Sequence, residues 1–184
     1  MITIRNAISQ YKGNISTNWE NEKYKWEAVQ HFQKYWNIDA EDFGGMVEEA
    51  FRLAYNLLAG GMYYAYGMIC LLSRQDPEKM RTLFRSLYDE TLPLTHRYLQ
   101  FRAVCGEVME EAKVSAANPQ KMINHYQDLR AICVYLSFKY PEKYFLYKYQ
   151  MYADFMKLTD FQPTSIEKIP RSGNMKISAV CAKL

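Results

Sequence analysis

The predicted fold depends on residues 124–149, which have the sequence NHYQDLRAICVYLSFKYPEKYFLYKY. The segments Arg130 to Tyr140 and Tyr144 to Tyr149 are rich in β-branched and aromatic residues, a composition typical of strands. Between them, Pro141 cannot donate a hydrogen bond to a β-ladder and favours a turn. The sequence therefore predicts an antiparallel β-hairpin over residues 130–149.

The two faces of this hairpin differ in chemistry. A four-residue loop would pair Phe138 with Phe145 and Leu136 with Tyr147, which gives an apolar face that should be buried. The opposite face mixes lysines with tyrosines, which can hold phosphates and stack on bases. The candidate nucleic-acid-binding residues are Arg130, Tyr135, Lys139, Lys143, Tyr144 and Lys148. The alternative interpretation is a solvated face whose lysines discourage edge-to-edge pairing of strands.

The rest of the chain shows the apolar spacing of helices. Gly13-Asn14 is expected to end the first helix, and Trp26 to lie on the buried stripe of the second. The second helix should contact a central helix, 62–72, which is apolar nearly all round. Asp39 is a good N-cap for the helix that follows it, and Asp76-Pro77 is an N-cap followed by a first-turn proline. The helices predicted from spacing and capping residues cover residues 2–12, 16–36, 39–58, 62–72, 77–89, 94–112, 120–126 and 150–158.

These elements predict a mainly α fold of the α+β class, with one antiparallel β-hairpin near the C-terminal end. Residues 1–161 form a single helical domain that includes the hairpin at 130–149. In residues 162–184, Pro163, Pro170 and Ser172-Gly173-Asn174 indicate a linker or tail. Residues 175–182 could add a strand to a suitable partner.

Composition limits the classes of function. The 184 residues are 49% hydrophobic, with a formal net charge of +3, which is a weak electrostatic footprint for nucleic acid. No apolar run is long enough for a membrane span, and the first residues lack the pattern of a signal peptide. The four cysteines show no C-x-x-C spacing, so a cytoplasmic protein is expected.

No motif points to catalysis. None of the three histidines has a second ligand at metal-binding spacing, and neither a phosphate-binding loop nor a nucleophile elbow is present. Glu111-Ala112-Lys113 has the E-x-K form found in many nucleases, but it lies on a predicted helix without a partner aspartate. We therefore expect no enzyme activity, no catalytic residue, no metal and no cofactor.

Two segments resemble the N-terminal region of bacterial McrB-like AAA+ restriction proteins. They are YKWEAVQHF at 24–32 with DAEDF at 39–43, and NHYQ at 124–127 with AI at 131–132 and YLSFKYPEKY at 135–144, continuing to Tyr149. In that group a region of this kind precedes a GTP- or ATP-hydrolysing motor, which works with a nuclease subunit against foreign DNA. The resemblance implies target recognition, with DNA and an AAA+ motor or nuclease as partners. The motor is absent from these 184 residues, so the chain is either an excised domain or a stand-alone relative, and neither hydrolysis nor cleavage is implied for it.

Two hypotheses of function follow. The first is a non-catalytic recognition module of a restriction or defence system that binds nucleic acid. The alternative is a helical protein–protein interaction module that docks on a motor or partner subunit without contacting DNA. A continuous basic face bearing tyrosines would favour the first hypothesis, and an exposed apolar patch would favour the second.

Overall fold

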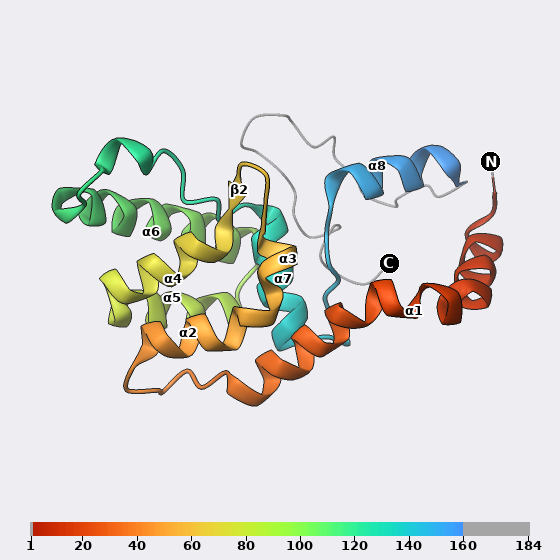
Figure 1. The fold of residues 1–184 in the computed structure, drawn as a ribbon, viewed down its shortest axis with the longest axis horizontal. Helices are drawn as coiled ribbons and strands as arrows, with labels where there is room; N and C mark the ends of the chain where they lie inside the picture. Colours follow the sequence, from red (N-terminus) through yellow and green to blue (C-terminus); the bar gives the residue numbers. More distant parts are fainter. Residues whose placement is uncertain (1, 160–184) are drawn as a thin grey trace.

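A computed structural model describes residues 2–159 of the chain, which form a mainly α-helical fold (Figure 1). Predicted elements in 162–184 lie outside the described residues. The elements, in chain order, are α1 (Ile4–Tyr35), α2 (Phe43–Phe51), η1 (Arg52–Ala54), α3 (Tyr55–Leu58), β1 (Ala59–Gly60), β2 (Tyr63–Tyr64), α4 (Ala65–Gln75), α5 (Pro77–Tyr88), α6 (Leu94–Ser115), η2 (Pro119–Lys121), α7 (Leu129–Lys139) and α8 (Tyr149–Leu158). The predicted helix at 120–126 is reduced to the single 3₁₀ turn η2. No described helix is both long and apolar enough to cross a bilayer.

The mainly α class with one antiparallel hairpin is confirmed, but the position of the hairpin was wrong. Within the described residues the hairpin is β1–β2, which pairs Ala59 with Tyr64 and Gly60 with Tyr63. Gly60 and Gly61 have positive φ angles of 148° and 56°, and such a turn requires glycine. The helix prediction for 39–58 did not identify Gly60-Gly61 as a hairpin turn.

The first predicted strand, Arg130 to Tyr140, instead forms most of helix α7 (Leu129–Lys139). Every side chain from Ala131 to Phe138 is buried, so the helix is apolar all round and carries no helical periodicity. A capping residue marks its start, because the Oδ1 of Asp128 accepts a 3.1 Å hydrogen bond from the Ala131 amide. Pro141 follows shortly after its end, where it cannot continue a helix. The burial predicted for Leu136 and Phe138 is confirmed, whereas Phe145 is exposed, Tyr147 is half-buried and Tyr135 is buried.

Helix α1 is a single helix in place of the two predicted helices. It runs through Gly13 without interruption, although Figure 1 shows a bend in its first half. Only its C-terminal part packs in the core, through Ala28, His31 and Phe32. Trp26 is 56% exposed, so its prediction as a core residue was wrong.

The core is built from aromatic side chains that surround α7. The ring of Tyr135 lies 4.9 Å from Phe51, 5.6 Å from Phe84 and 5.8 Å from Phe101, measured between centroids. Phe32 contacts Phe138 at 5.7 Å and so joins α1 to α7. The predicted central helix 62–72 is displaced: α4 begins at Ala65, and Met62 in the hairpin is 92% exposed.

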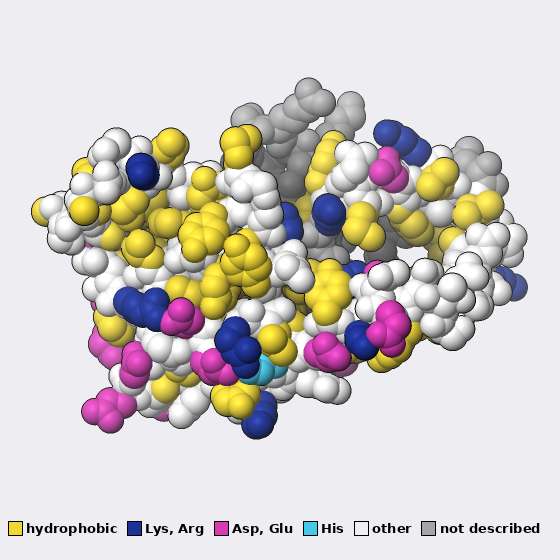
Figure 2. All heavy atoms as spheres, viewed as in Figure 1, with side chains coloured by type: hydrophobic (Ala, Val, Ile, Leu, Met, Phe, Trp, Pro, Cys, Tyr) yellow, Lys and Arg dark blue, Asp and Glu magenta, His cyan; other side chains and the backbone are white. Residues whose placement is uncertain are grey.

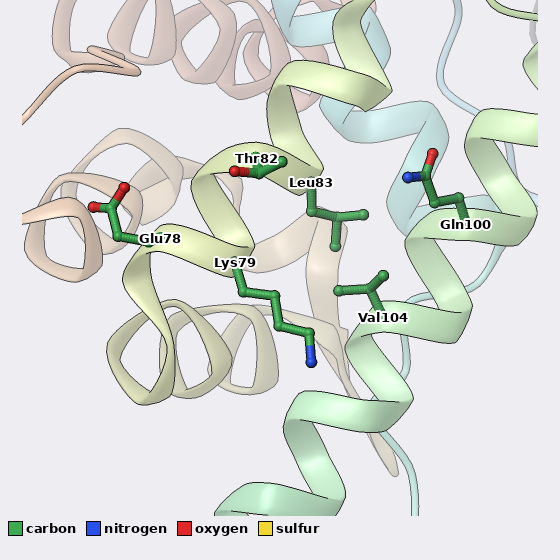
Figure 3. Close-up of a pocket in the computed structure, with 6 residues that line it drawn as sticks. All are labelled: Glu78, Lys79, Thr82, Leu83, Gln100 and Val104. Carbon is green, nitrogen blue, oxygen red and sulfur yellow. The ribbon is translucent and has the colours of Figure 1, made fainter.

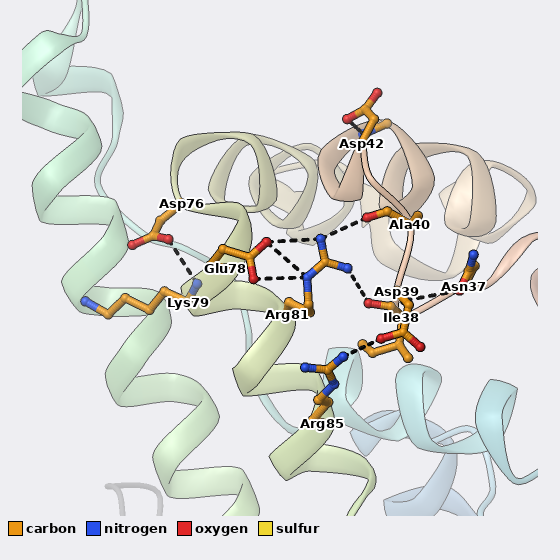
Figure 4. Close-up of polar contacts among 11 residues, drawn as sticks. Asn37, Ile38, Asp39, Ala40, Asp42, Asp76, Glu78, Lys79, Arg81 and Arg85 are labelled. Atoms are coloured by element: carbon orange, nitrogen blue, oxygen red, sulfur yellow. Dashed lines mark hydrogen bonds and ion pairs between the residues drawn. The ribbon is translucent and has the colours of Figure 1, made fainter.

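A buried arginine fixes the connection between α1 and α2 (Figure 4). The Arg81 guanidinium donates to the carbonyl of Ile38 and, at 2.8 Å, to that of Ala40, and it also pairs with Glu78. The predicted cap Asp39 instead pairs with Arg85, while Asp42 caps α2 with a 2.8 Å bond from the Gly45 amide. The charged side chains of Arg81, Arg85 and Asp42 therefore have a structural role, because they hold the connection between α1 and α2 in place.

Candidate functional site

The predicted nucleic-acid-binding residues do not form one exposed face. Tyr135 is completely buried, and its hydroxyl donates a hydrogen bond to the Oε1 of Gln127. Tyr144 is buried as well. Neither ring is available to stack on a base, because the helix that replaces the predicted strand turns Tyr135 into the core.

Lys143 and Tyr144 belong to a polar network around the connection between α5 and α6. The Oε1 of Glu90 accepts from the Tyr144 hydroxyl at 2.8 Å and pairs with Lys143 at 2.5 Å. The bond from Lys143 lowers the pKa of Glu90, and the bond to Glu90 raises the pKa of Lys143. Buried Arg97 donates to the Tyr144 hydroxyl at 3.0 Å and to the Leu87 carbonyl at 2.7 Å. This network ties the turn after α7 to the bundle.

The other three predicted cations are separated. The guanidinium of Arg130 lies over the ring of Tyr63, 4.4 Å from its centroid. The Lys139 Nζ lies 5.8 Å from the centroid of Tyr88. Lys148 is exposed at the N-cap position of α8. These side chains therefore stand in separate environments, two of them over tyrosine rings.

An aromatic groove lies between α1 and the segment that follows α7. It encloses about 270 Å³. Trp26 and Val29 of α1 form one wall, and the other wall comes from the segment after α7, where Phe145 is 47% exposed. The lining residues are Tyr11, Glu22, Lys25, Trp26, Val29, Ser137, Pro141, Tyr144, Phe145 and Leu146. Its charged members, Glu22 and Lys25, pair with each other at 2.5 Å, so the groove carries no net charge.

The groove continues along α1 as a line of exposed apolar side chains, which we call the α1 stripe. Its members follow one another at spacings of three, four or seven residues, which places them on one side of the helix. They are Ile8, Tyr11, Ile15, Trp19 and Trp26. Every residue from 8 to 21 is classed as exposed, and none of them belongs to the hydrophobic core.

A second surface, which we call the tyrosine face, lies around the β-hairpin and is visible as the central hydrophobic area in Figure 2. It consists of Tyr55, Met62, Tyr64 and Tyr66. The rings of Tyr55 and Tyr66 meet edge to face at 5.5 Å. Burial raises the pKa of Tyr66 to about 12, so it is neutral. Two ion pairs border this area, Arg52 with Glu49 and Arg74 with Glu48.

The hairpin beneath this face contacts the residues that precede α7. The Tyr63 hydroxyl donates a 3.0 Å bond to the Oδ1 of Asp128, and its ring meets that of Tyr126 at 5.9 Å. Tyr126 has a φ of 57°, an uncommon conformation for a residue other than glycine. Its neighbour His125 accepts a 3.0 Å bond at Nδ1 from the Gln127 amide. The contacts of Tyr63 thus join the hairpin to the turn before α7.

A second hollow lies between α5 and α6 (Figure 3). It encloses about 400 Å³ and is lined by Glu78, Lys79, Thr82, Leu83, Gln100 and Val104. Lys79 is already neutralised, at 3.1 Å from Glu111 and 3.2 Å from Glu107. The two charged residues of the E-x-K sequence have different partners, since Glu111 pairs with Lys79 and Lys113 pairs with Glu110. Among the described residues no cluster of histidine, cysteine and acidic side chains could hold a metal ion.

The aromatic groove was not predicted from the sequence, although the spacing of its tryptophan residue was noted. Trp19 and Trp26 have the spacing of a buried stripe, and spacing alone does not distinguish a stripe that packs in the core from one left open to a partner. Comparisons with protein-family models, curated proteins and solved structures found no match to this chain. The candidate function is therefore argued from these surfaces.

Proposed function

We propose that this chain is a non-catalytic recognition module that binds a protein partner through the aromatic groove and the α1 stripe. The observation that carries the proposal is Trp26, which stands more than half exposed beside Phe145 at an apolar groove. Exposed apolar areas with a polar border are typical of protein-interaction sites. Tryptophan and tyrosine are also the residues that most often dominate binding energy at such sites.

The surrounding charges support a protein partner over a nucleic acid at this groove. Lys25 is paired with Glu22, and Lys143, beyond the groove, is paired with Glu90. A phosphate backbone would need free cations here, because counterion release supplies most of its binding energy. An apolar side chain of a protein would instead displace water from Trp26 and Phe145 without desolvating a charge.

This proposal agrees with one part of the resemblance to McrB-like proteins. In the group that the chain resembles, a region of this kind acts together with a motor and a nuclease subunit. An AAA+ motor or nuclease subunit is the partner class that the resemblance implies. The groove offers such a subunit a docking site without DNA contact.

Site-specific photo-crosslinking tests the proposal. A photoreactive phenylalanine analogue replaces Trp26 in one sample and Leu99, a half-exposed residue on α6, in the control. We expect position 26 to form a protease-sensitive, nuclease-resistant adduct that position 99 does not form. The cross-linked protein is then identified and purified, and its dissociation constant is measured. Trp26→Ala and Phe145→Ala should each weaken binding by about 30-fold or more, as for other buried aromatic anchors. Equal adducts at both positions, or an adduct removed only by nuclease, would contradict the proposal.

Nucleic-acid binding is a second candidate function, now on the tyrosine face. Tyr55 and Tyr64 offer exposed rings beside Arg52 and Arg74, and base stacking on tyrosine does not require a strongly basic surface. Binding of methylated and unmethylated duplex and single-stranded DNA across salt concentrations tests it. Loss of stacking in Tyr55→Ala and Tyr64→Ala should each weaken binding by about 1–3 kcal/mol with little change in salt dependence. The idea fails if the wild type does not bind DNA at low salt.

A further inference from the structure

The wall of the aromatic groove that faces α1 is not helical. It belongs to residues 140–148, which connect α7 to α8 and which we call the connecting wall, and it contributes Pro141, Tyr144, Phe145 and Leu146 to the groove. Figure 1 shows this connection passing beside the middle of α1. Because the connecting wall lacks the internal hydrogen bonds of a helix, its position depends on the contacts that it makes with the rest of the fold.

Two successive residues of the connecting wall contact one carboxylate, that of Glu90 in the connection between α5 and α6. The Tyr144 hydroxyl donates to its Oε1 at 2.8 Å, and the Lys143 ammonium pairs with the same oxygen at 2.5 Å. Tyr144 is buried and directly precedes Phe145, which is 47% exposed at the groove. A planar peptide bond joins these two residues, so the position of the Tyr144 ring limits where Phe145 lies.

A buried charge stands behind this contact. Arg97 on α6 is 4% exposed, and its guanidinium donates to the Tyr144 hydroxyl at 3.0 Å. Within residues 2–159 no carboxylate pairs with Arg97 directly, and the Tyr144 hydroxyl links it to Glu90. The bonds from Lys143 and Tyr144, with a smaller contribution from Arg97, lower the pKa of Glu90, so this carboxyl is charged at neutral pH. Loss of the Glu90 carboxylate would therefore take an acceptor from Tyr144 and remove a compensating charge near Arg97.

The start of the connecting wall has separate attachments. The Tyr140 hydroxyl donates to the Tyr88 carbonyl at 2.8 Å, and the side-chain amide of Gln33 donates to the Lys139 carbonyl at 3.3 Å. These bonds end on backbone carbonyls and do not involve Glu90. Loss of the contacts to Glu90 should therefore release the part of the wall that carries Phe145 and leave the end of α7 in place.

We propose that Glu90 is a positioning residue for the aromatic groove, which holds the connecting wall through Tyr144 and Lys143 and thereby sets the affinity of the groove for its protein partner. The inference rests on the proposed function, for which it names a control point outside the binding surface. Glu90 is not among the described residues that line the groove. A wall that is already in place costs less to order when the partner binds, which is how preorganisation raises affinity.

Hydrogen exchange measured by mass spectrometry tests the hold on the wall without a partner. In Glu90→Ala the amides of residues 142–148 should exchange about 10-fold faster than in the wild type, because local opening no longer breaks the bonds to Glu90. Glu90→Gln keeps an oxygen that accepts from Tyr144, so its exchange should lie between these two. Glu107→Ala removes another glutamate that pairs with a lysine, and this matched control should leave residues 142–148 unchanged. No change in these residues, or faster exchange spread equally over α5, α6 and α7, would overturn the inference.

Binding to the protein captured at position 26 tests the effect on affinity. Glu90→Ala should weaken this binding by about 10-fold, Glu90→Gln should weaken it less, and Glu107→Ala should leave it unchanged. An unchanged affinity in Glu90→Ala would overturn the inference and leave the proposed function intact. If position 26 captures no protein, the proposed function fails and the inference fails with it, so the two failures are distinguishable.

Discussion

Gln127 lies fully buried beside Tyr135, and it uses both ends of its amide to hold the core together. Its Oε1 accepts the hydrogen bond from the Tyr135 hydroxyl at 2.5 Å. Its Nε2 donates to the carbonyls of Ala65 at 3.0 Å and His125 at 2.8 Å. One side chain thus joins the start of α4, the turn before α7 and the middle of α7.

Removing the hydroxyl of Tyr135 should therefore destabilise the protein without changing its packing. Tyr135→Phe leaves the Oε1 of Gln127 buried without its donor, which should cost about 1–3 kcal/mol of unfolding free energy. Chemical denaturation measures the change. Tyr149→Phe, at an exposed position, is the control and should change stability by less than about 0.5 kcal/mol. Equal stabilities would show that water replaces the lost hydroxyl.

Trp26 and Phe32 lie on the same helix but should respond differently to truncation. Phe32→Ala removes a completely buried ring from the core and should cost about 3–5 kcal/mol. Trp26→Ala removes a ring that is mostly in solvent and should cost less than about 1 kcal/mol. Thermal unfolding of the two variants at low protein concentration measures the difference. A large loss of stability in Trp26→Ala would show that the ring of Trp26 contributes to the core.

Acid should weaken the turn that contains His125. Burial, with a smaller effect from Arg102, lowers the pKa of His125 below its usual 6.5. The folded state therefore favours the neutral ring, whose Nδ1 accepts from the Gln127 amide. This contribution to stability is present above about pH 6.5 and is lost as the pH falls through the lower pKa of the folded state. His125→Asn keeps an acceptor that does not titrate. We expect the variant to lose less stability than the wild type in melts between about pH 7.5 and 5.5, and His96→Asn, at an exposed position, to behave as the wild type.

The same substitution should have opposite effects at two glycines. Neither Gly13 nor Gly61 has an atom within 4 Å of an added Cβ, so space does not distinguish them. Gly13 lies inside α1, where alanine should add about 0.5–1 kcal/mol of stability. Gly61 has a φ of 56°, where alanine should cost about 1–2 kcal/mol. Melting temperatures of Gly13→Ala and Gly61→Ala provide the comparison, and a shift of the same sign in both would contradict it.

The elements that local chemistry specifies were predictable from the sequence. Asp76 and Pro77 indicated the start of α5, and the Asp76 carboxylate does accept from the Lys79 amide at 2.9 Å. The predicted helix 150–158 likewise matches α8 within one residue. In both cases a cap or a one-sided apolar pattern is independent of tertiary contacts.

The elements that tertiary packing specifies were not predictable. The β-branched and aromatic content of α7 reflects burial on all sides, and a completely buried helix has no polar face to reveal its period. Placing the candidate site on that segment followed from the same error. The exposure of Trp26 depends on where the bundle ends along α1, and no local pattern records that boundary.

Helix α7 also has a consequence for the order of events during synthesis. It is the last helix of the core to leave the ribosome, yet its side chains Tyr135 and Phe138 fill the space between Phe32, Phe51, Phe84 and Phe101. The side-chain amide of Gln33 bonds the carbonyl of Phe138, a link across 105 positions of sequence. Contacts so distant in sequence form late, because the loop between them must close first. Until residue 139 has emerged, the nascent chain therefore exposes these four phenylalanines, and chaperone binding or aggregation at that stage competes with folding.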